Sequence, residues 1–326
     1  MSKQTKSSLL LLLTAFIWGT AFVAQKNGAH LGALTYNGIR TLIGGLVLIP
    51  VIKILDCRKK ATNFRDINTP KAETEVSALT TPKARDSALT DAENEKKILV
   101  FGSIALGIVL FAGSTLQQYG ITFTTVGKSG FITSLYAVEV PIFSIAIGKK
   151  VRPVIWLCVL MGVTGLYLLC MNGADFTLQK GDFFVCLCTL FFALQIMIID
   201  YCSPKCDPIR LACNQFIITG LICIVLMFFF EDPDIHEILR CWAPILYGGF
   251  LSVAVGYTLQ MVGQKNTPPT QASLILCLES VFSALAGAVL LGESMSPRQL
   301  IGCVIIFAAV VISQLPEREK TPAAEA

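Results

Sequence analysis

The sequence predicts an all-α integral membrane protein, in which ten transmembrane helices form two inverted five-helix repeats. Three observations lead to this fold class. Of the 326 residues, 54% are hydrophobic and only 15% are charged, whereas a soluble domain carries roughly 25% charged residues. The apolar residues gather in runs of about 20, the length of helix that crosses a bilayer. The two halves of the chain can also be aligned with each other.

The apolar runs are separated by short connections rich in Pro, Gly, Asp and Asn, which favour turns between antiparallel neighbours. The first run follows Lys3 and Lys6 in the manner of a signal peptide, but it lacks a small-x-small cleavage site, so we predict a retained span. The ten predicted spans are approximately Leu9–Ala24, Leu34–Leu55, Ile98–Leu116, Ser129–Gly148, Pro153–Met171, Gly181–Asp200, Pro208–Phe230, Cys241–Met261, Gln271–Leu291 and Pro297–Leu315.

One long segment, residues 57–97, has a different composition from the rest of the chain. It is rich in Lys, Glu, Thr, Asp, Asn and Ala and shows no apolar periodicity. Such a segment buries too little apolar surface to offset its ordering entropy, so it is expected to be a disordered insertion. The expected organisation is therefore a first repeat over residues 1–171 that contains the insertion, a second repeat over 172–315, and a tail over 316–326.

The repeat is visible as a constant offset between equivalent residues. An offset of 175 aligns Thr14 and Phe16 with Thr189 and Phe191, and beyond the insertion an offset of 143 aligns Gln117 with Gln260. Each half has an odd number of spans, so the second half must enter the membrane from the opposite side. Such inverted repeats can exchange conformations, which opens a central site first to one face of the membrane and then to the other.

The distribution of Lys and Arg predicts the orientation. With the N-terminus in the cytoplasm, the tails and cytoplasmic loops hold 20 Lys and Arg residues and the outer loops hold five. Because cytoplasmic loops carry the excess of basic residues, both termini are expected in the cytoplasm of a multi-pass plasma-membrane protein.

The stretch Lys128–Gly148 carries Glu139 and Pro141 near its middle. A carboxylate at that depth costs at least about 2.5–3.5 kcal/mol, so it is expected to face protein or a water-filled cavity. Tyr136 lies three residues before Glu139 on the same helical face, and the offset of 143 places Tyr136 on the second intramembrane acid, Glu279. We expect these three residues to line one central space, where either carboxyl group could bind substrate or exchange protons. A structural hydrogen bond to a neighbouring helix is the alternative for Glu279.

Arg40 is the counter-charge within the membrane, and three roles are open to it: holding a substrate carboxylate, neutralising one of the glutamates, or reaching to an interface. Trp18 is either a packing residue or an aromatic wall. Other polar residues could complete a cavity lining, although each could equally form a hydrogen bond between helices. These are Gln117, Tyr119, Gln195, Asn214, Gln215, Tyr257 and Gln260.

Most of the twelve cysteines lie inside apolar runs, where they are expected to pack as small apolar residues. Cys202 and Cys206 lie close in sequence, but the only histidines, His30 and His236, are far from them along the chain. No metal, cofactor or nucleic acid partner is therefore expected, and the expected partners are a small-molecule substrate, protons and the lipid bilayer.

Several motifs together make the chain similar to a known family. They are Phe16-Ile-Trp-Gly-Thr-Ala-Phe22, Arg40, Gln118-Tyr-Gly-Ile-Thr-Phe-Thr-Thr125, Phe131-Ile-Thr-Ser-Leu-Tyr136 with Pro141, Leu278-Glu-Ser-Val-Phe282 and Leu291-Gly-Glu293. The chain resembles the ten-span EamA-type carriers of the drug/metabolite transporter superfamily, over essentially its whole length except the insertion. It departs from the family pattern at Ser280, where a Pro often follows the Glu, and in the insertion itself.

The resemblance implies a secondary active transporter, by expectation an exporter of a small metabolite such as an amino acid or a related compound. We expect alternating access, with protons as a possible coupling ion. The alternative is an intramembrane enzyme acting on a lipid or lipid-linked substrate. That activity would require paired acids with His, or a nucleophile with a base, and no such set converges in the sequence.

Overall fold

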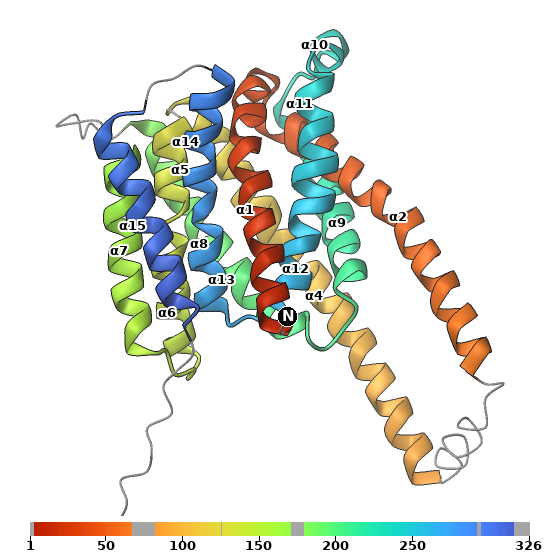
Figure 1. Ribbon diagram of the computed structural model, residues 1–326. Helices are drawn as coiled ribbons and strands as arrows, with labels where there is room; N and C mark the ends of the chain where they lie inside the picture. Colours follow the sequence, from red (N-terminus) through yellow and green to blue (C-terminus); the bar gives the residue numbers. More distant parts are fainter. Residues whose placement is uncertain (1–2, 67–81, 125, 171–178, 292–294, 316–326) are drawn as a thin grey trace, which may run out of the picture.

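A computed structural model describes residues 3–66, 82–124, 126–170, 179–291 and 295–315 (Figure 1). All regular structure in these ranges is helical, which confirms the all-α prediction. This architecture follows from the solvent, because a chain in lipid must satisfy its backbone N–H and C=O groups internally, and a helix does so within one segment.

The helices of the predicted first repeat are α1 (Lys3–Asn27), α2 (Ala33–Asp66), α4 (Pro82–Thr122), α5 (Val126–Thr133), α6 (Tyr136–Ala146) and α7 (Pro153–Cys170), and η1 (Ala29–Leu31) joins α1 to α2. The second repeat contains α8 (Lys180–Cys202), α9 (Pro208–Phe230), α10 (Ile235–Arg240), α11 (Trp242–Leu246), the π-helix η2 (Tyr247–Tyr257), α12 (Thr258–Gln264), α13 (Pro269–Leu276), α14 (Leu278–Leu291) and α15 (Pro297–Ser313).

Nine of the ten predicted spans correspond to membrane-length apolar segments in the structure. Within the described ranges, nine helical segments are long and apolar enough to cross a membrane, and α15, at the tenth place, has 17 residues. Side-chain contacts place both ends of the described chain at the same end of the bundle, since Ser8 Oγ donates to Gln314 Oε1 at 2.9 Å.

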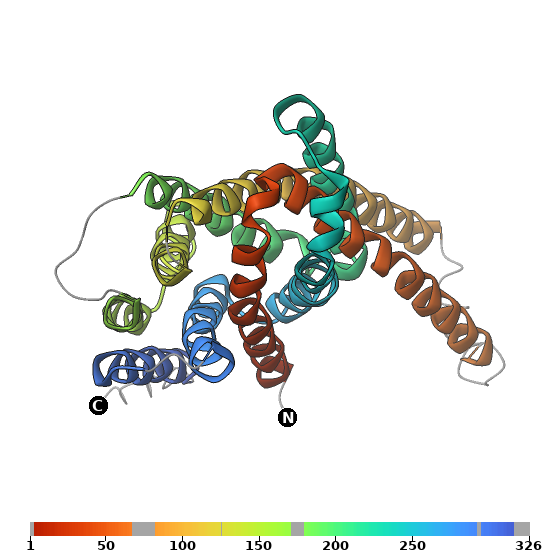
Figure 2. The ribbon, with the colours of Figure 1, turned by 90° about the horizontal axis from the view of Figure 1, so that it is seen from above.

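The helices repeat with the offsets expected from the sequence. The eight-residue helices α5 and α13 begin 143 residues apart, and α2 and α9 begin 175 residues apart. The packing is reciprocal as well: α1 packs against η2, α12 and α14, while α8 packs against α4 and α6. The pairs α2 with α9 and α7 with α15 each join equivalent helices; seen from above, α7 and α15 lie side by side at one edge of the bundle (Figure 2). Reciprocal contacts of this kind are characteristic of two units related by a twofold axis.

The stretch Lys128–Gly148, expected as one continuous span, is in fact two helices. α5 ends at Thr133 and α6 begins at Tyr136, and the equivalent span of the second repeat is interrupted between α13 and α14 at Cys277. The two breaks lie against each other, because Cys277 Sγ donates to the Ser134 carbonyl oxygen at 3.4 Å. Discontinuous spans that meet near the middle of an inverted repeat are the usual setting for a transporter binding site.

The expectation of a wholly disordered insertion is wrong at both of its ends. α2 continues to Asp66 and α4 begins at Pro82, so residues 57–66 and 82–97 are helical and extend beyond the bundle (Figure 1). Continuation of an existing helix avoids the cost of a new nucleus, and the i,i+4 spacing of Glu93 and Lys97 places opposite charges on one helical face. The part of the insertion between Asp66 and Pro82 lies outside the described residues.

Replacing residues 65–94 by a flexible Gly/Ser linker is expected to leave transport within about twofold of the native rate, because α2 is anchored by residues that precede the deletion. A Cβ at Gly44 would clash with Val253 Cγ1 on η2, and a Cβ at Gly45 would lie 2.8 Å from Ile217 Cγ1 on α9, so α2 packs closely against both helices before residue 65. The measurement is solute flux in proteoliposomes containing equal amounts of inserted protein. Complete loss of flux from normally inserted protein would assign the helical extensions to the transport machinery.

Candidate functional site

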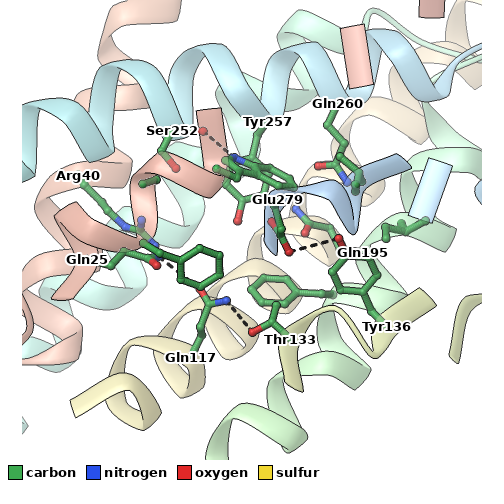
Figure 3. Close-up of a pocket in the computed structure, with 16 residues that line it drawn as sticks. Gln25, Arg40, Gln117, Thr133, Tyr136, Gln195, Ser252, Tyr257, Gln260 and Glu279 are labelled. Atoms are coloured by element: carbon green, nitrogen blue, oxygen red, sulfur yellow. Dashed lines mark hydrogen bonds between the residues drawn. The ribbon is translucent and has the colours of Figure 1, made fainter. Parts of the chain in front are cut away.

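A small polar pocket lies between the two repeats (Figure 3). Its volume of about 40 Å³ gives room for about three water molecules. Its apolar lining residues are Ala21, Phe22, Phe192, Ile196 and Leu276. The polar and aromatic lining residues are Trp18, Gln25, Arg40, Gln117, Thr133, Tyr136, Gln195, Ser252, Tyr257, Gln260 and Glu279.

The pocket straddles the axis that relates the repeats. Gln117 and Gln260 both line it and are equivalent at the offset of 143. Tyr136 and Glu279, equivalent at the same offset, touch each other: the Tyr136 hydroxyl donates to Glu279 Oε1 at 3.3 Å. Equivalent residues can be in contact only where the axis passes between them, so the pocket is central to both repeats.

Arg40 places a buried guanidinium group at one side of the pocket. It is 2% exposed, its Nε donates to Asn37 Oδ1 at 2.8 Å, and its guanidinium carbon lies 5.2 Å from the centre of the Tyr36 ring. Of the three roles open to Arg40, direct pairing with a glutamate is not seen in this structure, since it forms no ion pair with Glu139 or Glu279 in the described part of the chain. The side chain is buried and lines the pocket instead of lying on the outer surface of the bundle. The charged group therefore faces the pocket.

Glu279 places a carboxyl group in the same pocket. It lies in the first turn of α14, just after the break at Cys277, and is 4% exposed. Figure 3 shows it apart from Arg40, in the region between Tyr257 and Tyr136. One pocket thus contains a guanidinium and a carboxyl group that do not pair with each other.

Trp18 combines the two roles considered for it. Its Nε1 donates to the Ser252 carbonyl oxygen at 3.1 Å, and its ring lies 4.6 Å from that of Tyr257, while it also lines the pocket. The acceptor belongs to the π-helix η2, which occupies the middle of its span. π-helical turns are frequent at functional sites. Here the backbone hydrogen-bond pattern of η2 presents the Ser252 carbonyl oxygen to Trp18 on α1.

Several amide groups of the lining have unused hydrogen-bonding capacity. Among the described residues, Gln195 Nε2 and Gln260 Oε1 are buried without a partner. Gln25, by contrast, donates to Gln117 Oε1 at 3.3 Å, and Gln117 donates to Thr133 Oγ1 at 3.1 Å. A buried amide without a partner costs free energy, so a free donor and a free acceptor beside the pocket are suited to bind a polar solute.

Eight of the twelve residues selected from the sequence line this pocket, and four do not. Glu139 accepts a hydrogen bond from Thr189 Oγ1 at 2.5 Å and contacts α8 instead of the pocket. Tyr119 is 39% exposed and packs against Phe123 and Phe184. Asn214 and Gln215 lie on α9, outside the lining; Gln215 is fully buried, and Gly107, on α4, approaches its backbone.

The sequence reasoning missed Gln25, Thr133 and Ser252. Gln25 has a recognisable signal, because it follows Trp18 by seven residues and therefore occupies the same face of α1. Thr133 and Ser252 have no comparable signal: hydroxyl side chains are common in membrane helices, where they usually bond to their own backbone or to a neighbouring helix.

Gly19 allows α1 to approach the carboxyl-bearing helix. A Cβ at this position would lie 2.6 Å from the Glu279 carbonyl oxygen and 2.6 Å from the Phe282 Cβ. Gly19→Val is therefore expected to displace α14 and reduce transport at least about tenfold, because small displacements at a site have effects of this size or larger. Flux per inserted molecule tests this, with Gly130→Ala as the control, since its Cβ would meet only Ser280 Oγ, at 3.6 Å. Native flux in Gly19→Val would show that the close approach is not required.

The fold defines a multi-pass membrane protein with a polar pocket between its two halves. Residues 5–73 and 179–314 match the EamA-like transporter family. The chain belongs to this family, which confirms the resemblance found in the sequence.

Individual relatives are named as transporters or exporters. An uncharacterized transporter of Archaeoglobus fulgidus is 28% identical over 96% of this chain and 87% of its own length. The threonine/homoserine exporter RhtA of Escherichia coli K12 is 26% identical over 55% of this chain and 60% of its own length. A solved crystal structure superposes with a TM-score of 0.66 at 17% identity, covering 95% of this chain and 96% of that one, and supports the fold.

Proposed function

We propose that the protein is a secondary active exporter of small zwitterionic metabolites of the amino-acid type. The observation that carries this proposal is the presence of buried Arg40 and Glu279 in one pocket without an ion pair between them. A solute with a carboxylate and an ammonium group complements both charges. A buried charge without a partner is costly, so the bound zwitterion would stabilise a site that is otherwise electrostatically unsatisfied.

Within this proposal, Arg40 binds the solute carboxylate, since its planar guanidinium group can donate two parallel hydrogen bonds. Glu279 binds the ammonium group, and the free amides of Gln195 and Gln260 contact the polar part of the side chain. The naming of RhtA as a threonine/homoserine exporter supports the same solute class.

Alternating access and coupling follow from the same site. Glu279 can hold either a proton or the solute ammonium group, and such competition produces antiport: one leaves when the other binds. The reciprocal packing of the two halves supports an exchange between two equivalent arrangements. The excess of Lys and Arg in the loops at the end that holds both termini supports a plasma-membrane orientation with those termini in the cytoplasm.

The test is counterflow in proteoliposomes loaded with an unlabelled solute. Labelled threonine or homoserine is expected to accumulate transiently and saturably, and a pH gradient is expected to drive it uphill. A neutral sugar and a dicarboxylate serve as controls that match only part of the site. Saturable counterflow of a control solute without any zwitterion counterflow would overturn the proposed substrate class.

A further inference from the structure

A network of charged and polar groups closes one end of the pocket-forming bundle. Lys128, on α5, lies 3.3 Å from Asp182, on α8, and the two side chains are 15% and 4% exposed. Thr124 Oγ1 also donates to Asp182 Oδ1 at 2.5 Å. Lys26 extends the network, because its Nζ donates to the carbonyl oxygens of Ile121 and Thr124 at 2.8 and 3.2 Å. We call this the Lys128 end.

The repeat places an equivalent set of residues at the opposite end, which we call the Ser7 end. The offset of 175 relates Asp182 to Ser7, and the offset of 143 relates Lys128 to Gln271 and Thr124 to Thr267. These counterparts occupy the matching places: Ser7 is in the first turns of α1, as Asp182 is in α8, and Gln271 is near the start of α13, as Lys128 is in α5.

The contacts made by this second set are neutral. Gln271 accepts a hydrogen bond from Gln4 at 3.3 Å and donates to the Ser313 carbonyl oxygen at 2.9 Å. Ser7 accepts from Asn266 at 3.4 Å, and the hydroxyl group of Thr267 is buried without a partner among the described residues. Hydrogen bonds between charged groups are roughly twice as strong as neutral ones, and Asp182 accepts from both Lys128 and Thr124. Equivalent positions therefore hold the Lys128 end more tightly than the Ser7 end.

The Ser7 end also has a groove of about 790 Å³ between α1, α13 and α15, whose mostly apolar lining includes the polar residues Gln4, Ser8, Gln271 and Gln314. This end does contain ion pairs, of Lys149 with Asp200, Lys59 with Asp207 and Arg210 with Asp56, but the basic side chain of each pair is at least 45% exposed. Exposed ion pairs contribute little because water and salt screen them. The asymmetry between the equivalent sets therefore remains.

We propose that Lys128 and Asp182 are the latch of the transport cycle: they hold the Lys128 end closed, and the empty carrier rests with its pocket accessible only from the Ser7 end. This inference rests on the proposed alternating access. In the proposed orientation the Ser7 end is cytoplasmic, so the resting carrier awaits solute from the cytoplasm, as an exporter must. Solute binding would supply the free energy that separates the pair.

Two equivalent pocket residues allow accessibility to be measured from each end. Ala21 and Ile196 both line the pocket and are related by the offset of 175. Ala21→Cys reports access from the Lys128 end and Ile196→Cys access from the Ser7 end, in a background in which the exposed Cys57 and Cys186 are replaced by Ser. A membrane-impermeant maleimide is added to right-side-out or inverted vesicles, and the rate of labelling is compared with that of the background protein.

Asp182→Asn is expected to increase labelling of Ala21→Cys from the Lys128 end on the order of tenfold and to decrease labelling of Ile196→Cys from the Ser7 end, a coupling of typical size. The matched control is Asp200→Asn, the same substitution at the other end of the same helix, which breaks the exposed pair. It is expected to leave the labelling rates unchanged. Unchanged rates in Asp182→Asn, or equal effects of both substitutions, would overturn the latch.

The expected decrease in labelling of Ile196→Cys distinguishes a latch from general loosening of the Lys128 end. Loosening would raise access to the pocket from the Lys128 end without lowering access from the Ser7 end. A second variant moves the pair to the equivalent positions: Ser7→Asp with Gln271→Lys is expected to raise labelling of Ala21→Cys from the Lys128 end, while Asp182 stays intact. The labelling experiment requires no solute, so it tests the latch independently of the proposed substrate. The latch can be overturned while counterflow is observed. If no counterflow is observed, the labelling rates still test the latch.

Discussion

Replacing Arg40 by glutamine is expected to lower zwitterion counterflow about 100-fold while the protein still folds and inserts. The loss of a buried, charge-assisted pair with the solute carboxylate costs about 2–5 kcal/mol, which corresponds to a factor of this size. Insertion should survive, because the equivalent position of the second repeat, residue 215, is itself a fully buried glutamine. The measurement is the initial rate of counterflow per inserted molecule.

Two further variants interpret that result. Arg40→Lys keeps the charge but loses the two parallel hydrogen bonds, so an intermediate loss of about tenfold is expected. Arg210→Gln is the same substitution at an exposed ion pair with Asp56, and it is expected to transport at the native rate. Native counterflow in Arg40→Gln would show that this guanidinium group does not bind the solute.

The order of the helices could be predicted from the sequence because hydropathy and internal offsets determine it. Both offsets reappear in the helix starts: α5 and α13 show the offset of 143, and α2 and α9 show the offset of 175. The interruptions at Ser134 and Cys277 could not be predicted, since no helix-breaking residue occupies either position and the two breaks contact each other across the repeats. A tertiary contact of this kind leaves no periodic signal in either segment.

The sequence predicted a pocket residue correctly where a polar side chain also lies on the helical face that is turned toward the pocket. Tyr136 and Glu139 are three residues apart, but this spacing still rotates the side chain by about 60°. The rotation is enough to direct Glu139 to Thr189 on α8 while Tyr136 reaches Glu279. Tyr119 is two residues from Gln117 and so lies on the far face of α4, where it is exposed. Selection by residue type alone cannot separate a pocket residue from one that bonds to a neighbouring helix.

Replacing Glu279 by glutamine is expected to remove uphill transport driven by a pH gradient completely, because a side chain that cannot ionise cannot exchange a proton for the solute ammonium group. In the native protein, protonation of Glu279 competes with the solute, so the counterflow KM should rise as the pH falls, by up to about tenfold per pH unit once the carboxyl group is mostly protonated. In Glu279→Gln the KM should be high and independent of pH over the same range.

Glu139→Gln provides the matched control for this prediction, as the same substitution at the other intramembrane acid. Glu139 lies outside the pocket, and its bond from Thr189 requires only an acceptor oxygen, which glutamine also supplies. This variant should therefore keep both pH-driven transport and the rise of KM at low pH. If Glu139→Gln loses them and Glu279→Gln keeps them, the coupling group lies on the α8 side of α6, and protons reach the carrier through a path separate from the solute.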